Sequence, residues 1–469
     1  MADTQRMVNN SVEDEESVSL GARILTIGIG QGGASWVKEV LKEMPKCASK
    51  EDAYFVNLSS KDLKCVADTV DQSHLIQLNP TSGRIASSFD GAGKNRITAR
   101  GHWAEMPEKL NRVLWNAFCD SQKLAAAHQA MDDDFHPNED LLKERIPSMI
   151  LIAFSTDGGT GSGLGPLVTS YVSQMMLNSE DFSNRYGSQI PVFGVGLLPD
   201  ITNPEIGSES IGNSISCMKE ISASASKRLG RFLLIRNDYG DYSNSSLRKD
   251  RYDKVNMDSI KLMMRYLNNV HDSTISTLDN SDRWTSLSIP GIHAFATIPG
   301  EEPNAPADIV TADGPFVIPD GANVARVCYE LPDCYQRSIG DLRANVGYNA
   351  EETLTGYYEA NGNLCVDFYG TVDNKDIPII HFAGFSNLNK IAERYDERMR
   401  QIIAKAEKQK MVDAHGTGFK SNLKELKARN NVSSMVSGVR TSMEVAPDGA
   451  KKDFSKTFAD ALLGELAEE

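Results

Sequence analysis

Residues 154–163 read FSTDGGTGSG, and this glycine-rich stretch decides the fold. It follows the continuous apolar run SMILIAF at residues 148–154, which is typical of a strand covered on both faces of a sheet. It precedes a helical segment at residues 167–176. Glycines between a strand and a helix let the backbone approach a phosphate, and the helix N-terminus supplies N–H donors. Thr160 and Ser162 add hydroxyls for phosphate oxygens or for the shell of a magnesium ion.

A second glycine-rich stretch, GIGQGG at residues 28–33, lies between an apolar strand and a helix. Taken alone, it matches the dinucleotide fingerprint GxGxxG. That interpretation expects an acidic residue at the end of the next strand, but this strand ends at Asn57, so an NAD-dependent enzyme is a disfavoured alternative. Two such loops in one sheet instead predict several helix N-termini that converge on a polyphosphate. The sequence contains no GxxxxGK[ST] motif, which excludes a P-loop NTPase.

The rest of the chain supports an α/β fold. Residues 191–198 and 231–235 are further apolar runs separated by helical stretches, which predicts a parallel sheet flanked by helices. Residues 257–270 place apolar side chains on one face of a helix. Five β-rich segments then predict a second, mixed α+β domain: residues 291–298, 324–331, 354–359, 364–372 and 378–385. A long amphipathic helix is predicted from residue 386.

Size and composition exclude several classes of protein. The 469 residues allow two or three domains, and a hydrophobic content of 40% is enough for a sizeable core. The net charge of −15 argues against a surface that binds nucleic acid directly. The scattered cysteines contain no CxxC pair, as is typical of reduced thiols in a cytosol. The acidic N-terminus has no signal-peptide core, and no apolar run approaches the ~18 residues that span a bilayer. We therefore expect a cytoplasmic protein without membrane insertion.

These loops resemble those of the tubulin/FtsZ superfamily of GTPases. GGTGSG at residues 158–163 matches the signature loop, usually written GGGTG[ST]G, and GAGKN at residues 91–95 resembles the loop that senses the γ-phosphate in FtsZ. A ribose-binding loop and two guanine-binding asparagines follow in the expected order, and an asparagine amide can both donate to and accept from guanine. Asn256, the second of them, is expected to open the central helix. The residues that the resemblance assigns to nucleotide binding are Gly28, Gly30, Gln31, Gly32, Gly33, Asn57, Gly91, Ala92, Gly93, Lys94, Asn95, Asp157, Gly158, Gly159, Thr160, Gly161, Ser162, Gly163, Pro199, Asp200, Glu205 or Glu209, Asn237 and Asn256.

A further match, LDNSDR at residues 278–283, follows the central helix. It resembles the NxDxxD loop of FtsZ, which one subunit inserts against the γ-phosphate of the next. The resemblance implies that Asp279 and Asp282 polarise the attacking water once two subunits meet. Two residues depart from the family pattern: Thr277 replaces the Asn of NxDxxD, and Asp157 replaces the first signature glycine. The implied ligands are GTP or GDP with Mg²⁺, which is held mainly through phosphates and water, with Asp157 as a candidate ligand.

The mixture of motifs most resembles the bacteriophage and plasmid tubulins (the PhuZ and TubZ groups). The resemblance implies a three-layer nucleotide-binding domain with a parallel sheet, a central helix, a second α+β domain and a C-terminal helical tail. The expected organisation is a disordered acidic extension at 1–21, a GTP-binding domain at 22–252, the central helix at 253–275, an α+β activation domain at 276–385, and a long helix with a tail at 386–469.

The implied function is that of a GTPase that polymerises head-to-tail and hydrolyses GTP at the junction between subunits. Its implied role is to position or segregate phage or plasmid DNA, in the host cytoplasm if a phage encodes it. The implied partners are further copies of the chain in a protofilament, and an adaptor or cargo protein bound through the C-terminal tail. Two alternatives remain open: an FtsZ-like cell-division or cell-shape filament, and a non-polymerising nucleotide-dependent regulator, which Asp157 and Thr277 motivate.

Overall fold

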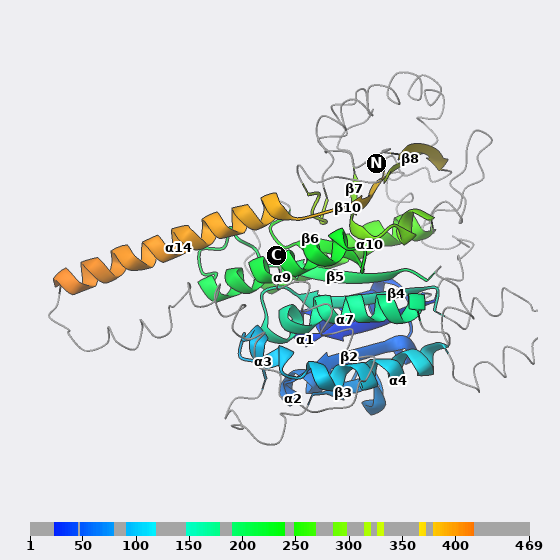
Figure 1. Ribbon diagram of the computed structural model, residues 1–469, viewed down its shortest axis with the longest axis horizontal. Coiled ribbons are helices and arrows are strands. Elements are labelled where there is room, and N and C mark those ends of the chain that lie inside the picture. Colours follow the sequence, from blue (N-terminus) through cyan, green and yellow to red (C-terminus); the bar gives the residue numbers. More distant parts are fainter. Residues whose placement is uncertain are drawn as a thin grey trace, which may run out of the picture.

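A ten-stranded sheet with helices on both faces forms the body of the protein (Figure 1). The computed structural model describes residues 23–45, 47–78, 91–118, 147–178, 190–239, 248–268, 285–297, 314–319, 326–332, 365–371 and 379–416. The strand order is β3-β2-β1-β4-β5-β6-β7-β10-β8-β9. The first seven strands along this order run parallel: β3 Leu75–Gln77, β2 Ala53–Asn57, β1 Ile24–Ile29, β4 Met149–Ser155, β5 Val192–Leu198, β6 Arg231–Arg236 and β7 Gly291–Thr297.

Burial on both faces explains why the central strands are apolar at nearly every position. Every residue of β1 and β5 is buried, and β4 is buried up to its last residue, Ser155. In the parallel register, Gly28 of β1 lies beside Phe55 of β2 and Ala153 of β4. The carboxyl ends of these strands therefore meet at one edge of the sheet.

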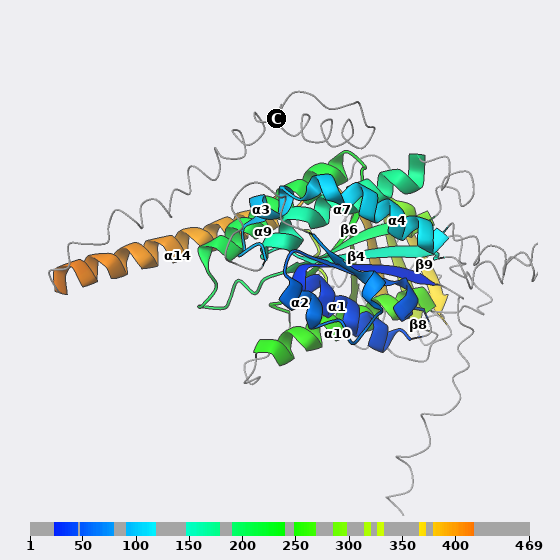
Figure 2. The same ribbon diagram turned by 90° about the horizontal axis from the view of Figure 1, so that it is seen from below.

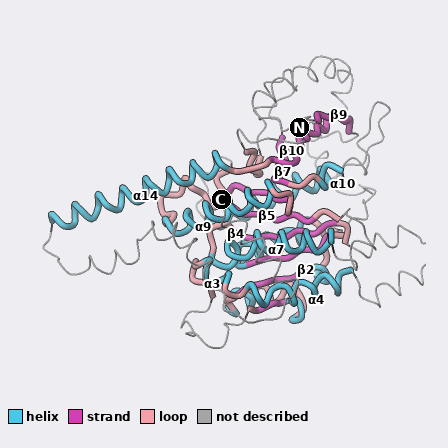
Figure 3. Tube along the Cα trace, in the orientation of Figure 1, coloured by secondary structure: helices cyan, strands magenta, loops and turns pink. Residues whose placement is uncertain are grey.

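The helices form two layers. One face of the sheet carries α1 and α10, which contact each other, and the other face carries α3, α4, α7 and α9 (Figure 2). A final helix, α14, packs against α9 and extends beyond the sheet (Figure 3). The bounds are α1 Gly30–Glu43, α2 Ser60–Lys64, α3 Arg96–Arg100, α4 Met106–Phe118, α7 Gly159–Asn178, α9 Ser208–Ser226, α10 Arg248–Asn268 and α14 Asn389–Gly416.

The last three strands continue the same sheet: β8 Arg326–Pro332, β9 Cys365–Thr371 and β10 Ile379–Phe385. β10 runs antiparallel to both β7 and β8, and β8 runs parallel to β9. At the start of β7, Gly291 has a φ of +128°, and a Cβ there would lie 2.8 Å from the Cα of Gly384 in β10. Only glycine fits this conformation and this approach between the two strands.

A chain of buried polar side chains joins β7, β10 and α10. The carbonyl oxygen of Ile289 accepts from Nε2 of His293 at 2.7 Å, so Nδ1 of His293 accepts from Nε2 of His381 at 3.0 Å. Nδ1 of His381 then accepts from the hydroxyl of Tyr266 at 3.0 Å. Burial lowers the pKa of His293 to about 3. Burial, with the nearby His293 and Arg326, lowers the pKa of His381 well below its usual value. Both imidazoles are therefore neutral at physiological pH.

The described helices begin earlier than the sequence predicts. The apolar pattern places helix starts near residues 167 and 257, whereas α7 begins at Gly159 and α10 at Arg248. α1 likewise begins at Gly30, inside the first glycine-rich stretch. Both glycine-rich stretches are therefore largely first turns of helices. Packing against neighbouring backbone overrides the weak helix propensity of glycine at these positions. The predicted strand at residues 354–359 lies outside the described residues.

Candidate functional site

The loops that the sequence assigns to a nucleotide lie at the carboxyl ends of β1, β2, β4, β5 and β6. This is the edge at which open α/β sheets bind ligands. α1 begins directly after β1, and α7 begins shortly after the end of β4, so two helix N-termini open at the same edge. Each N-terminus offers unpaired N–H groups and a partial positive charge, which favours an anion.

The two glycine-rich stretches contact each other. Gly30 has a φ of +70°, and a Cβ there would lie 3.2 Å from the backbone nitrogen of Gly161. A Cβ on Gly161 would lie 3.3 Å from the carbonyl oxygen of Ile29, which directly precedes Gly30. Glycine at both positions lets the backbones of the two loops touch, which brings the two helix N-termini together. Gln31, in the first turn of α1, is exposed.

Packing also explains the glycines that flank these positions in both loops. A Cβ on Gly33 would lie 2.1 Å from the carbonyl oxygen of Ala153, and one on Gly32 would lie 2.7 Å from the Cβ of Ser155. By contrast, Gly158 has open space where its Cβ would be. The space beside Gly158 is therefore open, whereas Gly32 and Gly33 make room for atoms of the neighbouring strand.

Loop 91–95 packs on the first turn of α7. A Cβ on Gly159 would lie 2.7 Å from the Cβ of Ala92 and 2.9 Å from the nitrogen of Asn95. Lys94, at the tip of the loop, has a φ of +62°, which is uncommon for a residue with a side chain. Nδ2 of Asn213 in α9 donates to the carbonyl oxygen of Lys94 at 2.7 Å and to that of Asp157 at 3.2 Å. Asn213 thus joins loop 91–95 to the loop that follows β4.

We expect Gly159→Ala to lower the free energy of unfolding by about 1–3 kcal/mol, because the added methyl group overlaps loop 91–95. Gly158→Ala is the matched control, since the added methyl group enters open space and the change should stay within about 0.5 kcal/mol. Chemical denaturation of both variants without nucleotide measures the difference. Equal stability of the two variants would contradict this packing.

Asp157 brings a half-buried carboxylate to the edge of the sheet, and this carboxylate accepts a hydrogen bond from the hydroxyl of Ser155. Asn57, at the end of β2, is buried; its Oδ1 accepts from the nitrogen of Ser59 at 3.2 Å and from the hydroxyl of Thr160 at 3.4 Å. The hydroxyl of Ser162 donates to the carbonyl oxygen of Gly158. Asn57 and Ser162 therefore have partners within the protein, and both support the loop after β4.

The loop after β5 is held by α14. The hydroxyl of Tyr395 donates to the carbonyl oxygen of Pro199 at 3.0 Å, and Nη2 of Arg398 donates to the carbonyl oxygen of Asn203 at 3.4 Å. Oδ1 of Asp200 accepts from the nitrogen of Thr202 at 2.9 Å and from its hydroxyl at 2.5 Å. Burial raises the pKa of Tyr395 well above its usual value, and the negative charges of three carboxylates add to the shift: Asp238, Asp157 and Asp200. Tyr395 is therefore a neutral hydroxyl close to the site.

The two candidate ribose ligands, Glu205 and Glu209, are both exposed. Glu205 lies in the loop after β5, and Glu209 lies in the first turn of α9. The structure leaves both carboxylates accessible to a ligand from the solvent side.

Two buried asparagines carry side-chain oxygens that no described residue pairs. Asn237 follows β6 and donates from Nδ2 to the carbonyl oxygen of Leu198 at 2.7 Å, while its Oδ1 has no hydrogen-bond partner within the described part of the chain. Oδ1 of Asn256 likewise has no partner among the described residues. The two residues are 8% and 5% exposed. A buried acceptor without a donor is costly, so these oxygens fit a ligand that brings N–H groups.

The sequence predicted that Asn256 opens the central helix, and this prediction is wrong. α10 begins at Arg248, which places Asn256 in the third turn. Its carbonyl oxygen accepts from the hydroxyl of Ser259 at 2.7 Å, and the hydroxyl of Ser259 accepts from Nε1 of Trp36 in α1 at 3.4 Å. This link ties the turn that holds Asn256 to the helix that starts at the first glycine loop.

Asp279 and Asp282, together with Thr277, lie outside the described residues. In the part of the chain that the structure describes, no group of three or more histidine, cysteine or acidic side chains is placed to hold a metal ion. None of the described helices is both long enough and apolar enough to cross a membrane.

Some of the residues that contact the loops of the site belong to no sequence motif, among them Arg96, Asn213 and Tyr395. Their partners are distant in the chain, with separations of 66, 119 and 196 residues for the bonds to Ser162, Lys94 and Pro199. No local pattern predicts such contacts.

Comparison with known proteins identifies the fold. No family model matches the sequence, and no curated protein matches it. TubZ of Bacillus thuringiensis serovar israelensis, in a GTPγS-form protofilament, matches with 18% identity and a TM-score of 0.54 over 85% of this chain and 95% of that chain. A tail-truncated TubZ of Clostridium botulinum phage c-st matches with 15% identity and a TM-score of 0.52 over 82% and 98%.

The chain has the tubulin-like fold. CetZ2 from Haloferax volcanii, in a GTPγS-bound protofilament, shares it with 17% identity and a TM-score of 0.50 over 82% of this chain and 99% of that chain. The fold class predicted from the two glycine-rich stretches is therefore confirmed. In this tubulin-like fold the candidate site occupies the carboxyl edge of the parallel strands, α10 is the central helix, and α14 is the long C-terminal helix.

Proposed function

We propose that this chain binds GTP at the carboxyl edge of its sheet. The observation that carries the proposal is the pair of buried, unpaired Oδ1 atoms on Asn237 and Asn256, which have no partner among the described residues. Guanine presents a ring N–H and an exocyclic amino group on one edge, and these donors suit two asparagine oxygens. Adenine has no such ring N–H, so the same oxygens would favour guanine over adenine.

The phosphates of the nucleotide would lie against the N-termini of α1 and α7. These helices meet where Gly30 contacts Gly161, and the turn at Gly158 leaves open space beside them. Backbone N–H groups at helix N-termini hold phosphate oxygens. Mg²⁺ would be held mainly by the phosphates and water, and Asp157 is the described carboxylate at this turn that can join its shell. Two helix N-termini that meet at one edge support a triphosphate ligand rather than a dinucleotide.

We further propose that the chain polymerises head-to-tail and hydrolyses GTP at the junction between two subunits. The matching TubZ and CetZ2 structures are protofilaments with GTPγS, which supports the same use of the fold here. In this scheme Asp279 and Asp282 of one subunit orient water at the nucleotide of the next, so assembly completes the catalytic site.

Right-angle light scattering tests this function. With GTP we expect scattering to rise and then to decay as GTP is consumed; with a slowly hydrolysed analogue it should rise and persist. Asp279→Ala should assemble with GTP and stay assembled, with a turnover at least about 100-fold lower, because water is no longer oriented. Ser281 lies between the two aspartates in the sequence, and Ser281→Ala serves as the matched control with normal decay.

A flat scattering trace with both triphosphates, despite measurable GTP binding, would contradict the filament and favour a non-polymerising nucleotide-dependent regulator. One observation favours that second candidate: the half-buried carboxylate of Asp157 stands at the phosphate turn, where it repels an anionic ligand. A repelled triphosphate would turn over slowly.

For the cellular role, we propose a cytoplasmic filament that positions or segregates phage or plasmid DNA through an adaptor or cargo protein. The C-terminal tail that would bind this partner lies outside the described residues. An FtsZ-like role in cell division remains the alternative for the same polymer. Co-sedimentation of filaments with the DNA-binding partner, with and without residues 417–469, separates the two roles.

A further inference from the structure

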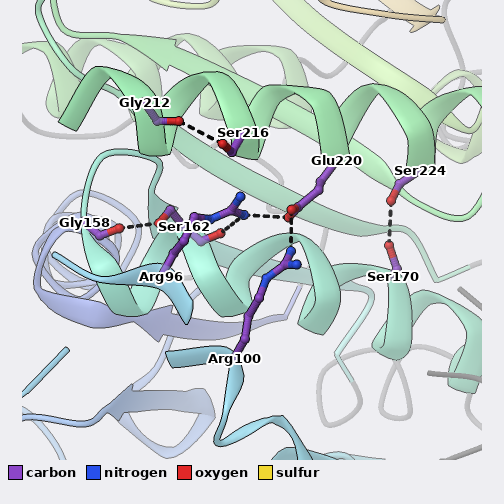
Figure 4. A network of polar contacts seen from close by, with 9 residues as sticks. All are labelled: Arg96, Arg100, Gly158, Ser162, Ser170, Gly212, Ser216, Glu220 and Ser224. Atoms are coloured by element: carbon purple, nitrogen blue, oxygen red, sulfur yellow. Dashed lines mark hydrogen bonds and ion pairs between the residues drawn. The ribbon is translucent and has the colours of Figure 1, made fainter. Parts of the chain in front are cut away.

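A proline inside α7 frees a backbone carbonyl beneath the phosphate edge. Pro166 lies within α7, and proline has no N–H to donate to the carbonyl four residues earlier, which is that of Ser162. Nη2 of Arg96, the first residue of α3, donates to this carbonyl oxygen at 2.9 Å. Arg96 thus takes the place of the missing helical donor and fixes α3 to the first turn of α7 (Figure 4).

Arg96 is itself held by α9. Its Nη2 lies 2.8 Å from Oε2 of Glu220, and Oε1 of the same carboxylate pairs with Arg100, one turn further along α3 (Figure 4). The side chains of Arg96 and Glu220 are only 12% and 17% exposed, so solvent screens their interaction weakly. Burial raises the pKa of the neighbouring Cys217 thiol to about 12, which keeps this thiol neutral. Two guanidinium groups and one carboxylate therefore leave a net positive charge under the phosphate edge.

Loop 91–95 leads directly into Arg96. Oδ1 of Asn95 caps α3 by accepting from the nitrogens of Ile97 and Thr98 at 2.9 and 3.3 Å. The strained backbone of Lys94 precedes this cap, and Asn213 of α9 holds its carbonyl oxygen. The end of the loop is therefore held at two points: by Asn213 at Lys94 and by the ion pair with Glu220 at Arg96.

The loop lies at the far end of the site from the proposed base. The base is assigned to Asn237 after β6, whereas a Cβ on Gly91 would lie 3.2 Å from the Cβ of Ser59, which follows β2. In the sheet, β6 and β2 are separated by β5, β4 and β1. A nucleotide whose base lies at β6 and whose phosphates lie along this edge would place its third phosphate at loop 91–95.

We propose that Arg96, anchored by Glu220, is a positioning residue that holds loop 91–95 for the third phosphate and so sets the preference for a triphosphate over a diphosphate. This inference rests on the proposed function. Arg96 does not touch the nucleotide; it acts through the loop that it ends. Its link to the carbonyl freed by Pro166 couples the loop to α7, and its ion pair couples the loop to α9.

The test compares the affinities of fluorescent GTPγS and GDP analogues at protein concentrations below assembly. Arg96→Met should weaken GTPγS binding by about tenfold and GDP binding by less than about twofold, because the charge-assisted hydrogen bond that anchors the third-phosphate loop is lost. Arg96→Lys should restore part of the preference for GTPγS over GDP, since one ammonium group can pair with Glu220 but cannot also reach Ser162. Arg112→Met is the matched control, because Arg112 pairs with Glu108 on the exposed face of α4, and it should leave both affinities unchanged.

Thermal unfolding shows whether each variant is folded. If Arg96→Met does not fold, Glu220→Gln replaces it, since this change keeps the side-chain volume and removes the anchoring charge. The ratio of the affinity for GTPγS to the affinity for GDP should again fall. An equal loss of affinity for both nucleotides would overturn the inference and assign Arg96 a purely structural role. Failure of the wild-type chain to bind either nucleotide would instead refute the proposed function, so the two failures are distinguishable.

Discussion

Asn256→Leu is expected to weaken GTP binding by about 100-fold while leaving the fold at least as stable as the wild type. Leucine has nearly the same volume but no acceptor, so the donors of guanine would be buried without a partner. In the free protein the substitution removes a buried oxygen that has no partner among the described residues, which is why stability should not fall. The preference for GTP over ATP should shrink by a similar factor.

Isothermal titration with GTP and ATP, paired with chemical denaturation, measures both effects. Asn178→Leu is the matched control, because Asn178 is exposed at the end of α7 and should not alter nucleotide affinity. Asn237→Leu should also lose GTP binding, but at a cost in stability, since its Nδ2 bonds the carbonyl oxygen of Leu198. Normal GTP affinity in Asn256→Leu would remove the main support for guanine recognition.

The free energy of unfolding is expected to fall by about 2 kcal/mol between pH 8 and pH 5 through the buried His293 alone, and His381 shifts it further in the same direction. Burial holds the pKa of His293 at about 3 and lowers that of His381 well below 6.5. Below pH 6.5 the unfolded chain takes up a proton on each imidazole and the folded chain does not. Protonation therefore stabilises the unfolded state as the pH falls, and the free energy of unfolding decreases. The contribution of the two histidines to stability is complete only above pH 6.5.

Urea denaturation across this pH range tests the expectation. A variant with both His293 and His381 changed to Gln should show a much flatter dependence on pH, although its stability at pH 8 should be lower because the chain from Ile289 to Tyr266 is altered. An unchanged slope in the double variant would show that other groups cause the acid sensitivity.

Apolar runs of sequence were sufficient to predict the central strands of the parallel half, whereas the short, partly exposed edge strand β3 was not predicted. β1, β4, β5 and β6 are buried on both faces, and such strands are apolar without alternation, so they stand out from their surroundings. The helix starts were harder to predict. Gly159 begins a helix because backbone from loop 91–95 packs on it, and the start of α10 is too polar to show an apolar period.

The two glycine-rich loops of the site were predictable because each directly follows a strand, but the groups that support the site were not. Arg96 acquires its role from a carbonyl that Pro166 frees and from Glu220 on another helix. In the sequence, nothing distinguishes Asn213 from other polar residues of a helix. Its two acceptors, on Lys94 and Asp157, come together only when two loops converge on α9. Tertiary contacts of this kind leave no periodic trace in the sequence.

The attachment of α14 has a mechanical consequence. At ~1.5 Å per residue, this helix of 28 residues is about 42 Å long, and no proline interrupts it. Tyr395 and Arg398 fasten its first turns to the loop after β5. The remaining length from Arg398 to Gly416 is a rigid rod of about 27 Å, so a tilt of about 10° at the fastening moves its tip by about 5 Å. α14 therefore pivots at the loop after β5. A small shift of this loop, which need not alter the body of the protein, produces a larger displacement at the far end of α14.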